Sequence, residues 1–414
     1  MEFCTNLKPN EIDEFVKHHP FGHYMKTSFW AKYKAELEGY KIIYTGIKEQ
    51  GEIKATAIVL KKRSWFAHKP YLYIPTGMCI DHQQEVLWDF FIDNLIKLTR
   101  IEKAAFLRID PNILRCHRTI NGERVDDGFS NEWVSEKLIE KGFYHKGYGY
   151  AYNGSWINRY TLIIDLSLSI ETIYAKFARS KQNVLKRHPL MGVTTRIATK
   201  DELSYLVDFE WELTRTQGFK PHDIAFFNTL YSMLGENVRY YVTEVNLAVQ
   251  IANIDKELAS NKYKKDREAQ LAKTNERERA LTLRLRYGEN VTIAAGLFVV
   301  YGSNCWDLYT YNRKDFNSYK ATDSLHAFVI KDMKDHGVLR YDMVGFSGVV
   351  SKDDPYYGLY DYKRSFGSDF YEHIGEFDYV INKKAYRYFK TMLYQIKRVR
   401  RKWFSIRYKK NRAE

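Results

Sequence analysis

The chain has 414 residues, of which 45% are hydrophobic and 16% aromatic, and its formal net charge is +14. This composition excludes a largely disordered protein, and the length exceeds what one hydrophobic core usually supports, so we expect two domains. The four cysteines are scattered without paired spacing. That pattern argues against a zinc-binding or disulfide framework and favours a reducing cytosol.

No segment of the sequence predicts insertion into a membrane. No apolar run approaches the roughly 20 residues that a spanning helix needs. Residues 1–15 also lack the basic-then-apolar pattern of a signal peptide. We therefore expect a soluble or peripheral protein.

The first part of the chain alternates between predicted strands and helices. A helix is predicted at residues 11–18, strands at 40–49, 53–63 and 71–81, a helix at 84–100 and a strand that ends before Pro111. The pattern starts again at residue 159 with the strand RYTLIIDLSL. It continues with helices at 201–217, 223–234 and 321–335 and with the strands VRYYVTEV, VTIAAGLFVVYG, CWDLYTYN and RYDMVGF. Two halves of similar order predict an α/β (α+β) fold with two GNAT-like acyltransferase domains.

Residues 247–287 have a different character. They contain no glycine or proline, and Leu247, Ile251, Ile254 and Leu258 follow a helical spacing of four, three and four. Sixteen of the 33 residues from 255 to 287 are charged. This predicts an antiparallel coiled-coil arm at 246–289, inserted in the second half, that projects from the body and contributes little to the core. The alternative is a disordered loop.

Positive charge is concentrated at the end of the chain. Residues 383–414 hold thirteen Lys or Arg and one acidic residue, interleaved with aromatic and aliphatic side chains. This predicts a basic amphipathic tail that binds a polyanion, either an anionic membrane surface or tRNA. The alternative is a solvated helix end without a partner.

Familiar catalytic motifs are absent from the sequence. It contains no GxxxxGK[ST], HExxH or GxSxG, and its twelve histidines show no metal-ligand spacing. We therefore expect no metal and no cofactor, and any acyl transfer should be direct. The sole Gly-x-Gly lacks the preceding Arg/Gln-x-x of the pyrophosphate loop, which disfavours acyl-CoA as the donor.

The stretch LYDYKRSFG places Lys363 and Arg364 between aromatic residues, before a strand-like run. Adjacent cations in such a place either decorate a strand end or hold an anionic group. On the strand interpretation, Arg364 points away from the face that Lys363 occupies.

Several segments together resemble the Fem family of non-ribosomal peptidyltransferases, which transfer amino acids from aminoacyl-tRNA to peptidoglycan precursors. They are FWAKYKAELEGY, FLRIDP, SKQNVLKRHPLMGV, LTRTQGF and the run from AAGLFVVYG to GEFD. The arm and tail make the chain similar to the MurM/MurN-like branch, which modifies lipid II. The resemblance implies a first domain at 1–155, completed by about 376–395, a second at 156–375, and a cleft between them. It also implies aminoacyl-tRNA as the co-substrate and a location at the inner face of the plasma membrane.

The resemblance also assigns residues. Lys34, or its neighbour Lys32, and Arg215 match the clamp for the precursor's diphosphate. Asp110 matches an acidic cleft residue and Lys363 a lysine implicated in catalysis. The aromatic side chains Trp30, Phe219, Tyr309 and Tyr362 are expected to contact substrate. The chain departs from the pattern at Ala105, where the arm-less relative has an aromatic residue, so contacts on that wall stay open.

Other interpretations of these residues remain. Lys34 equally suits a solvated helix face, and Arg215 suits a cation that complements the end of a helix dipole. Asp110 suits a turn cap, and Tyr309 a core aromatic. For the whole chain, the competing functions are a non-enzymatic adaptor that binds RNA or membrane and an acyl-CoA-dependent N-acyltransferase.

Overall fold

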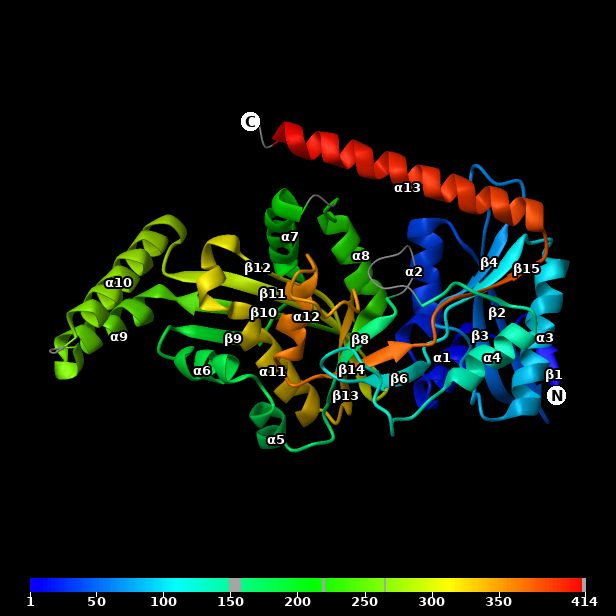
Figure 1. Cartoon of the computed structure of the whole chain (residues 1–414), viewed down its shortest axis with the longest axis horizontal. Coiled ribbons are helices and arrows are strands. Elements are labelled where there is room, and N and C mark those ends of the chain that lie inside the picture. Colours follow the sequence, from blue (N-terminus) through cyan, green and yellow to red (C-terminus); the bar gives the residue numbers. More distant parts are fainter. Residues whose placement is uncertain (149–157, 218–219, 264–265, 412–414) are drawn as a thin grey trace.

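The computed structural model describes residues 1–148, 158–217, 220–263 and 266–411. The predicted domain limit at 155/156 and the predicted site residue Phe219 lie outside these ranges. Two mixed sheets lie side by side along the long axis of the molecule (Figure 1). Helices cover both sheets, as expected for an α/β protein.

The first sheet has seven strands in the order β1-β2-β3-β4-β5-β15-β7. Its strands are β1 (Glu2–Cys4), β2 (Lys41–Glu49), β3 (Glu52–Lys62), β4 (Tyr71–Ile74), β5 (Phe106–Ile109), β7 (Tyr144–His145) and β15 (Phe377–Val380). The accompanying helices are α1 (Pro9–His18), α2 (Ser28–Glu38), α3 (Glu85–Ile101) and α4 (Glu132–Glu140), with a 3₁₀ turn, η1, at Tyr24–Lys26. In α3, Leu87, Phe91, Leu95 and Leu98 recur at helical spacing and are buried against this sheet.

The second sheet has eight strands in the order β6-β14-β8-β13-β12-β11-β10-β9. They are β6 (Leu114–Arg118), β8 (Tyr160–Asp165), β9 (Val193–Ile197), β10 (Val238–Asn246), β11 (Asn290–Tyr301), β12 (Asn304–Asn312), β13 (Arg340–Phe346) and β14 (Asp369–His373). The helices are α5 (Ile170–Ala175), α6 (Arg179–Arg187), α7 (Ser204–Gln217), α8 (Ile224–Leu234), α11 (Ala321–Asp335) and α12 (Tyr357–Arg364). The central strand β11 is apolar on both faces because helices cover both.

The chain passes between the two sheets four times, after β5, β6, β7 and β14, and the first and last of these crossings meet. Strand β6 lies within residues 1–155 but pairs with β14 in the second sheet. The first sheet is in turn completed by β15, which pairs with β5 and β7. The sheets therefore do not follow a single division at residue 155. The two crossing segments, 110–113 and 374–376, lie side by side, and the amide of Ile374 donates to the carbonyl of Ile113 at 3.0 Å.

One hydrophobic cluster is shared by both halves. It contains Trp30 and Tyr33 of α2 together with Leu206 of α7, Leu297 of β11 and Trp306 of β12. The hydroxyl of Tyr301 also donates to the carbonyl of Asp13 at 3.0 Å. Because the halves share buried apolar surface, the space between them has fixed walls.

Residues 359–364 of the segment LYDYKRSFG belong to helix α12, so the strand interpretation of Lys363 and Arg364 is wrong. Tyr360 and Lys363, three residues apart, are both buried, which is helical rather than alternating spacing. The helix has only eight residues. An apolar period is difficult to recognise over so short a stretch.

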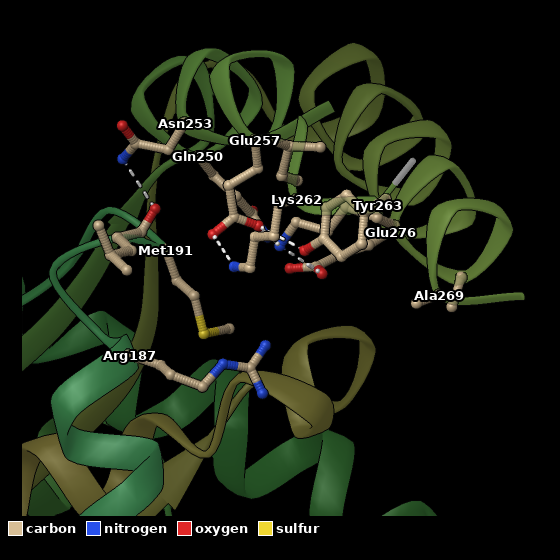
Figure 2. A pocket seen from close by; sticks show the side chains of 13 residues that line it. Arg187, Met191, Gln250, Asn253, Glu257, Lys262, Tyr263, Ala269 and Glu276 are labelled. Carbon is tan, nitrogen blue, oxygen red and sulfur yellow. Dashed lines mark hydrogen bonds and ion pairs between the residues drawn. The ribbon is translucent and has the colours of Figure 1, made fainter. Parts of the chain in front are cut away.

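The predicted arm is a helical hairpin of α9 (Leu247–Ala259) and α10 (Arg267–Tyr287) at one end of the molecule (Figure 1). A hollow of about 460 Å³ separates it from α6 and the turn that follows, with Arg187 and Met191 on the body side and Glu257 and Glu276 on the arm (Figure 2). The arm thus stands away from the body beyond its base.

The base of the arm belongs to the core, contrary to the prediction that the arm contributes little to it. Leu247 and Leu283 are buried in the cluster that packs under α11. The hydroxyl of Tyr319 donates to Gln250 at 2.8 Å. The contribution of the arm to the core was hard to recognise in the sequence, because its buried apolar residues lie only in the helical turns nearest the sheet.

The C-terminal segment forms one helix, α13 (Lys383–Asn411), which crosses one side of the molecule (Figure 1). The first turns of α13 contribute to the hydrophobic cluster that the two halves share. Phe389 is buried against Phe66 and Phe106, and the hydroxyl of Tyr386 donates to Asp378 at 2.6 Å. Within the described ranges, no helix has both the length and the apolar character that crossing a bilayer requires.

Two deletions in the arm should therefore differ in their effect on stability. Asp255 and Arg277 form an ion pair at 2.5 Å, so α9 and α10 can be joined there by a short Gly-rich turn. We expect removal of residues 257–275 to leave the free energy of unfolding within about 1 kcal/mol of wild type, since exposed positions dominate that part. Removal of residues 247–287 should cost at least about 3 kcal/mol, because buried leucines are lost. Urea unfolding measures both, and equal losses would contradict the assignment of the base to the core.

Candidate active site

A cavity of about 580 Å³ lies where the crossing segments meet the second sheet. A smaller cavity lies beside Asp110, and Asn112 and His373 line both cavities. Residues lining one or both of these cavities include Asp110, Asn112, Arg159, Trp306, Asp342 and His373. A cavity with convergent polar groups between two domains is the expected form of a substrate site.

Asp110 follows β5 and is buried in the wall of the smaller cavity. Its carboxylate accepts hydrogen bonds from the hydroxyl of Tyr73 at 2.6 Å and from the amide of Thr76 at 2.6 Å. Burial raises the pKa of this carboxyl well above its usual range. When it is ionised, a carboxylate with a raised pKa is a stronger base than an exposed one.

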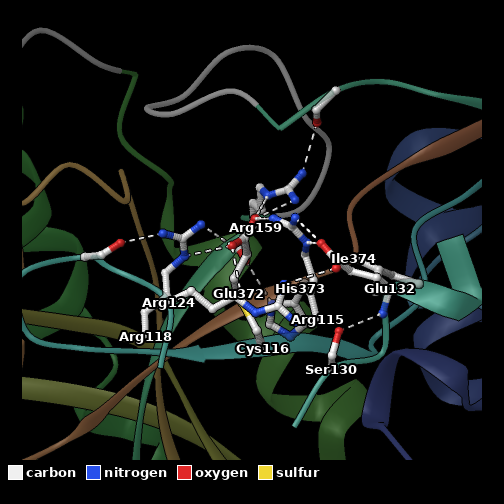
Figure 3. Close-up of polar contacts among 12 residues, drawn as sticks. Arg115, Cys116, Arg118, Arg124, Ser130, Glu132, Arg159, Glu372, His373 and Ile374 are labelled. Atoms are coloured by element: carbon white, nitrogen blue, oxygen red, sulfur yellow. Dashed lines mark hydrogen bonds and ion pairs between the residues drawn. The ribbon is translucent and has the colours of Figure 1, made fainter. Parts of the chain in front are cut away.

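Beside Asp110, where the two sheets meet, the chain is held together by the buried carboxylate of Glu372. Glu372 of β14 accepts hydrogen bonds from Arg159 at 2.6 and 2.8 Å, from Arg115 at 3.0 Å and from Arg118 at 2.7 Å (Figure 3). The guanidinium groups of Arg115 and Arg159 also lie over the ring of Tyr148, at 3.9 and 3.8 Å. Charge-assisted bonds of this kind are short and geometrically specific. They join β6, β14 and the start of β8, and so set the position of His373, the next residue along β14.

In the second sheet the parallel strands β12 and β13 separate. They pair at only three positions, from Asn304↔Arg340 to Trp306↔Asp342. Beyond that point β13 bulges against β8, and Val344 takes a φ of +61°, which is unusual for a β-branched residue. Met343 and Val344 therefore have no partner in the register with β8, and the pairing resumes at Gly345 opposite Thr161.

Lys363 fills this gap from α12. Its buried ammonium donates to the carbonyls of Met343, Val344 and Gly345, the last two at 3.1 Å. Burial lowers the pKa of Lys363, while the nearby carboxylates Asp307 and Asp342 oppose that change. All three ammonium protons are thus engaged. A direct role as oxyanion donor stays a prediction, and it requires Lys363 to release one carbonyl.

Asp307 and Asp342 are site candidates that sequence analysis missed. Asp342 lines the large cavity and accepts a hydrogen bond from the amide of Val344 at 2.7 Å. Asp307 accepts one from the hydroxyl of Thr310 at 2.6 Å, and burial raises its pKa to about 6. The available signal was an aspartate in the middle of each strand-forming run, CWDLYTYN and RYDMVGF, where charged residues are unfavourable.

The predicted diphosphate clamp lies apart from the cavities. Lys34 is on α2, where it forms an ion pair with Glu38 and lies 5.5 Å from the ring of Trp30. Lys32 is exposed on the same helix, and Arg215 is exposed near the end of α7. Helix α2 contacts α8, through Tyr33 and Phe226 among others, and α8 is the next helix along the chain after α7, which carries Arg215 (Figure 1).

The predicted aromatic contacts are mostly packed inside the protein. Trp30 is buried and stacks on Tyr33 at 4.8 Å, so it supports α2 from within instead of facing substrate. Tyr309 packs edge-to-face against Phe227 at 5.3 Å. Tyr362 lies under the ammonium of Lys181, 4.1 Å from its ring centre. Of these three, Tyr362 also lines a hollow near the start of α11.

Comparison with known proteins identifies the family to which this chain belongs. The model of the FemAB family matches residues 7–394, nearly the whole chain. The chain belongs to the FemAB family. The predicted family is thus confirmed, whereas the MurM/MurN-like branch stays a prediction.

Its relatives match over similar lengths. The lipid II:glycine glycyltransferase of Staphylococcus haemolyticus (strain JCSC1435) is 25% identical over 406 residues, which is 92% of this chain and 94% of the relative. The protein of the same name from Staphylococcus aureus (strain USA300) is 24% identical over 408 residues, with the same coverage. The crystal structure of FemX superposes with a TM-score of 0.78 at 22% identity, covering 94% of this chain and 99% of FemX. The predicted fold class is confirmed by this FemAB-family architecture.

The position of Lys363 predicts a large loss of stability for Lys363→Met. Removing the ammonium leaves three carbonyls without their donor and the neighbouring carboxylates of Asp307 and Asp342 without a cation, so we expect the free energy of unfolding to fall by at least about 3 kcal/mol. Arg364→Met is the matched control. Arg364 is more exposed and pairs with Asp361 on its own helix, so its loss should cost under about 1 kcal/mol. Urea unfolding of both variants tests this. If Lys363→Met were as stable as wild type, the structural role of Lys363 would be contradicted and only a chemical role would be left.

Proposed function

We propose that this protein is an aminoacyltransferase that moves an amino acid from aminoacyl-tRNA to a side-chain amine in the stem peptide of a peptidoglycan precursor. The lipid-linked precursor lipid II is the proposed acceptor, and the product is the branch that bridges stem peptides. The observation that carries this proposal is the match, along more than nine-tenths of both chains, to proteins named lipid II:glycine glycyltransferase.

The cavity chemistry suits an amine acceptor. An alkyl amine with a pKa near 10.4 is almost wholly protonated at pH 7 and must lose its proton before it attacks. Asp110 is a buried carboxyl with a raised pKa in the cavity wall. A cationic amine placed beside it favours the ionised carboxylate, which then accepts the proton. The donor is an activated ester, so no enzyme nucleophile is required.

Attack on the ester produces a negatively charged tetrahedral oxygen. From Asp307 onwards, β12 has no strand on its β13 side among the described residues. Backbone amides along that open edge are donors of the type that stabilises such an oxygen. In this proposal Lys363 is mainly a positioning residue, because its ammonium holds the facing strand at the required separation.

A second hollow suits the end of the tRNA. It has a volume of about 490 Å³, lies at the start of α11, and is lined by Lys181, Lys320 and Tyr362 among others. The positive end of a helix dipole together with lysine side chains attracts phosphate. We place the 3′ end of the tRNA here, with the aminoacyl ester directed toward the gap between β12 and β13.

The exposed cations of α2 and α7 suit the precursor's diphosphate. Lys34 and Arg215 carry this role in the proposal, with Lys32 as a neighbour of Lys34. Lys34 forms an exposed ion pair with Glu38, which is weak and is exchanged for phosphate at small cost. The basic helix α13 would hold the enzyme peripherally at the inner face of the plasma membrane, where a lipid-linked acceptor lies. Binding of tRNA is the alternative role for α13.

Reconstituted transfer tests the proposal. Purified protein is incubated with a lipid-linked precursor and a mixture of aminoacyl-tRNAs, and the precursor is analysed by mass spectrometry. We expect the mass of one amino acid to appear on the stem-peptide side chain. Deacylated tRNA with free amino acids, and acetyl-CoA in place of tRNA, serve as the matched reactions and should give no product. Transfer from acetyl-CoA, or no transfer from any charged tRNA, would overturn the proposal.

A further inference from the structure

Trp65 is unusually exposed for a large aromatic side chain. It lies in the loop 63–70 between β3 and β4, and 86% of it is accessible to solvent. Among the tryptophans whose side chains are described, the next most exposed is Trp211, at 52%. Neither the fold nor the proposed chemistry uses Trp65. An apolar ring held in water marks a surface that another phase or molecule covers.

The loop presents this ring on a fixed support. Phe66, the next residue, packs on the buried Phe389 of α13 with ring centres 5.7 Å apart. Trp65 contacts Phe66 edge-on at 5.4 Å. Ala67 is buried, and its amide closes a turn by donating to the carbonyl of Ser64 at 2.9 Å. Trp65 is therefore at the tip of an anchored turn.

The same loop lies beside the outward face of α13 (Figure 1). His68 stacks with Tyr388 at 6.5 Å, which links the loop to that face. Exposed residues follow one stripe of the helix at spacings of three and four. They are Lys384, Arg387, Tyr388, Thr391, Tyr394 and Arg398. Arg63 and Lys69 add exposed positive charge from the loop.

We propose that the Trp65 loop and this stripe of α13 form one membrane-binding surface whose partner is an anionic bilayer. Trp and Tyr are the residues that settle at headgroup depth, and the surrounding Lys and Arg attract the negative leaflet. The inference deepens the proposed function, because it places the first sheet's end of the enzyme on the membrane that holds the acceptor.

The chemistry of the stripe favours a bilayer over RNA. RNA would use Trp65 and the tyrosines for base stacking and the cations for phosphate. It has no comparable use for an exposed aliphatic residue, and Val399, the residue after Arg398 of the stripe, is 66% exposed. A bilayer interface accommodates aliphatic, aromatic and cationic side chains together.

Vesicle binding by the full-length protein tests the surface without precursor or tRNA. The vesicles contain phosphatidylcholine with or without 30% phosphatidylglycerol, roughly the anionic content of a strongly charged leaflet. We expect flotation with the anionic vesicles only, reversed by raised salt. Trp65→Ala should weaken the partition about tenfold, since the ring no longer leaves water. Trp211→Ala, the matched loss of an exposed tryptophan, should leave it unchanged.

Brominated lipid gives a second measurement that depends on the position of Trp65 itself. Bromine on the upper acyl chain should quench part of the tryptophan fluorescence of wild type and of Trp211→Ala, and that part should vanish in Trp65→Ala. The exposure of Trp65 predicts an unchanged melting temperature for this variant. The charge-reversing variant Arg387→Glu should weaken binding at low salt only.

Three results would overturn the inference. They are equal vesicle binding by wild type and Trp65→Ala, quenching that persists without Trp65, and a loss of tRNA affinity in Trp65→Ala with vesicle binding intact. The last result would assign the surface to RNA. Since the vesicles carry no substrate, failure here leaves the transferase proposal standing, and failed transfer leaves this surface standing.

Discussion

The separation of β12 and β13 is the constraint on which the site depends. The two strands pair at three positions and then part, so the backbone of residues 343–345 loses a neighbouring strand. Buried carbonyls without donors are costly. The ammonium of Lys363 replaces the missing amides with three hydrogen bonds. This contact stabilises the separated arrangement of the two strands.

The gap is adjacent to the other polar groups of the cleft. Asp342 lies at the last paired position of β13 and lines the cavity that also contains His373. His373 follows Glu372, which three arginines hold at the junction, and its ring contacts Asn112 at 3.0 Å. Asn112 belongs to the crossing segment that begins with Asp110. The proposed acceptor side, near Asp110, and the proposed donor side, near the gap, are thus connected through a few polar residues.

The periodic parts of this architecture were predictable from sequence. Helix α11 and strand β13 occupy the predicted ranges because each has a clear apolar period. The two-sheet fold and the arm followed from the order and composition of the segments. Within the site, Asp110 was placed correctly at the end of a strand, because Pro111 stops β5.

The rest depended on contacts between distant residues. The burial of Lys363 results from the gap in β13, which its own eight-residue helix does not reveal. The exchange of β6 and β15 between the sheets depends on Glu372 meeting Arg115 and Arg118 from a segment more than 250 residues earlier. Trp30 was assigned to substrate although the core shared by the two halves covers it. Such features arise from tertiary packing, which overrides local pattern.

The central claim is that Asp110 receives the acceptor amine, and a binding cycle tests it most directly. Two soluble precursor analogues are compared, one with a lysine in the stem peptide and one with norleucine, which lacks the amine. Calorimetry measures their affinities for wild type and for Asp110→Asn, with melting temperatures as the check on folding. The account predicts that the norleucine analogue binds wild type at least about tenfold more weakly than the lysine analogue, because the pair between the amine and Asp110 is lost. The two analogues should bind Asp110→Asn with similar affinity, because that pair is already absent from this variant. An equal loss of affinity in both proteins would contradict it.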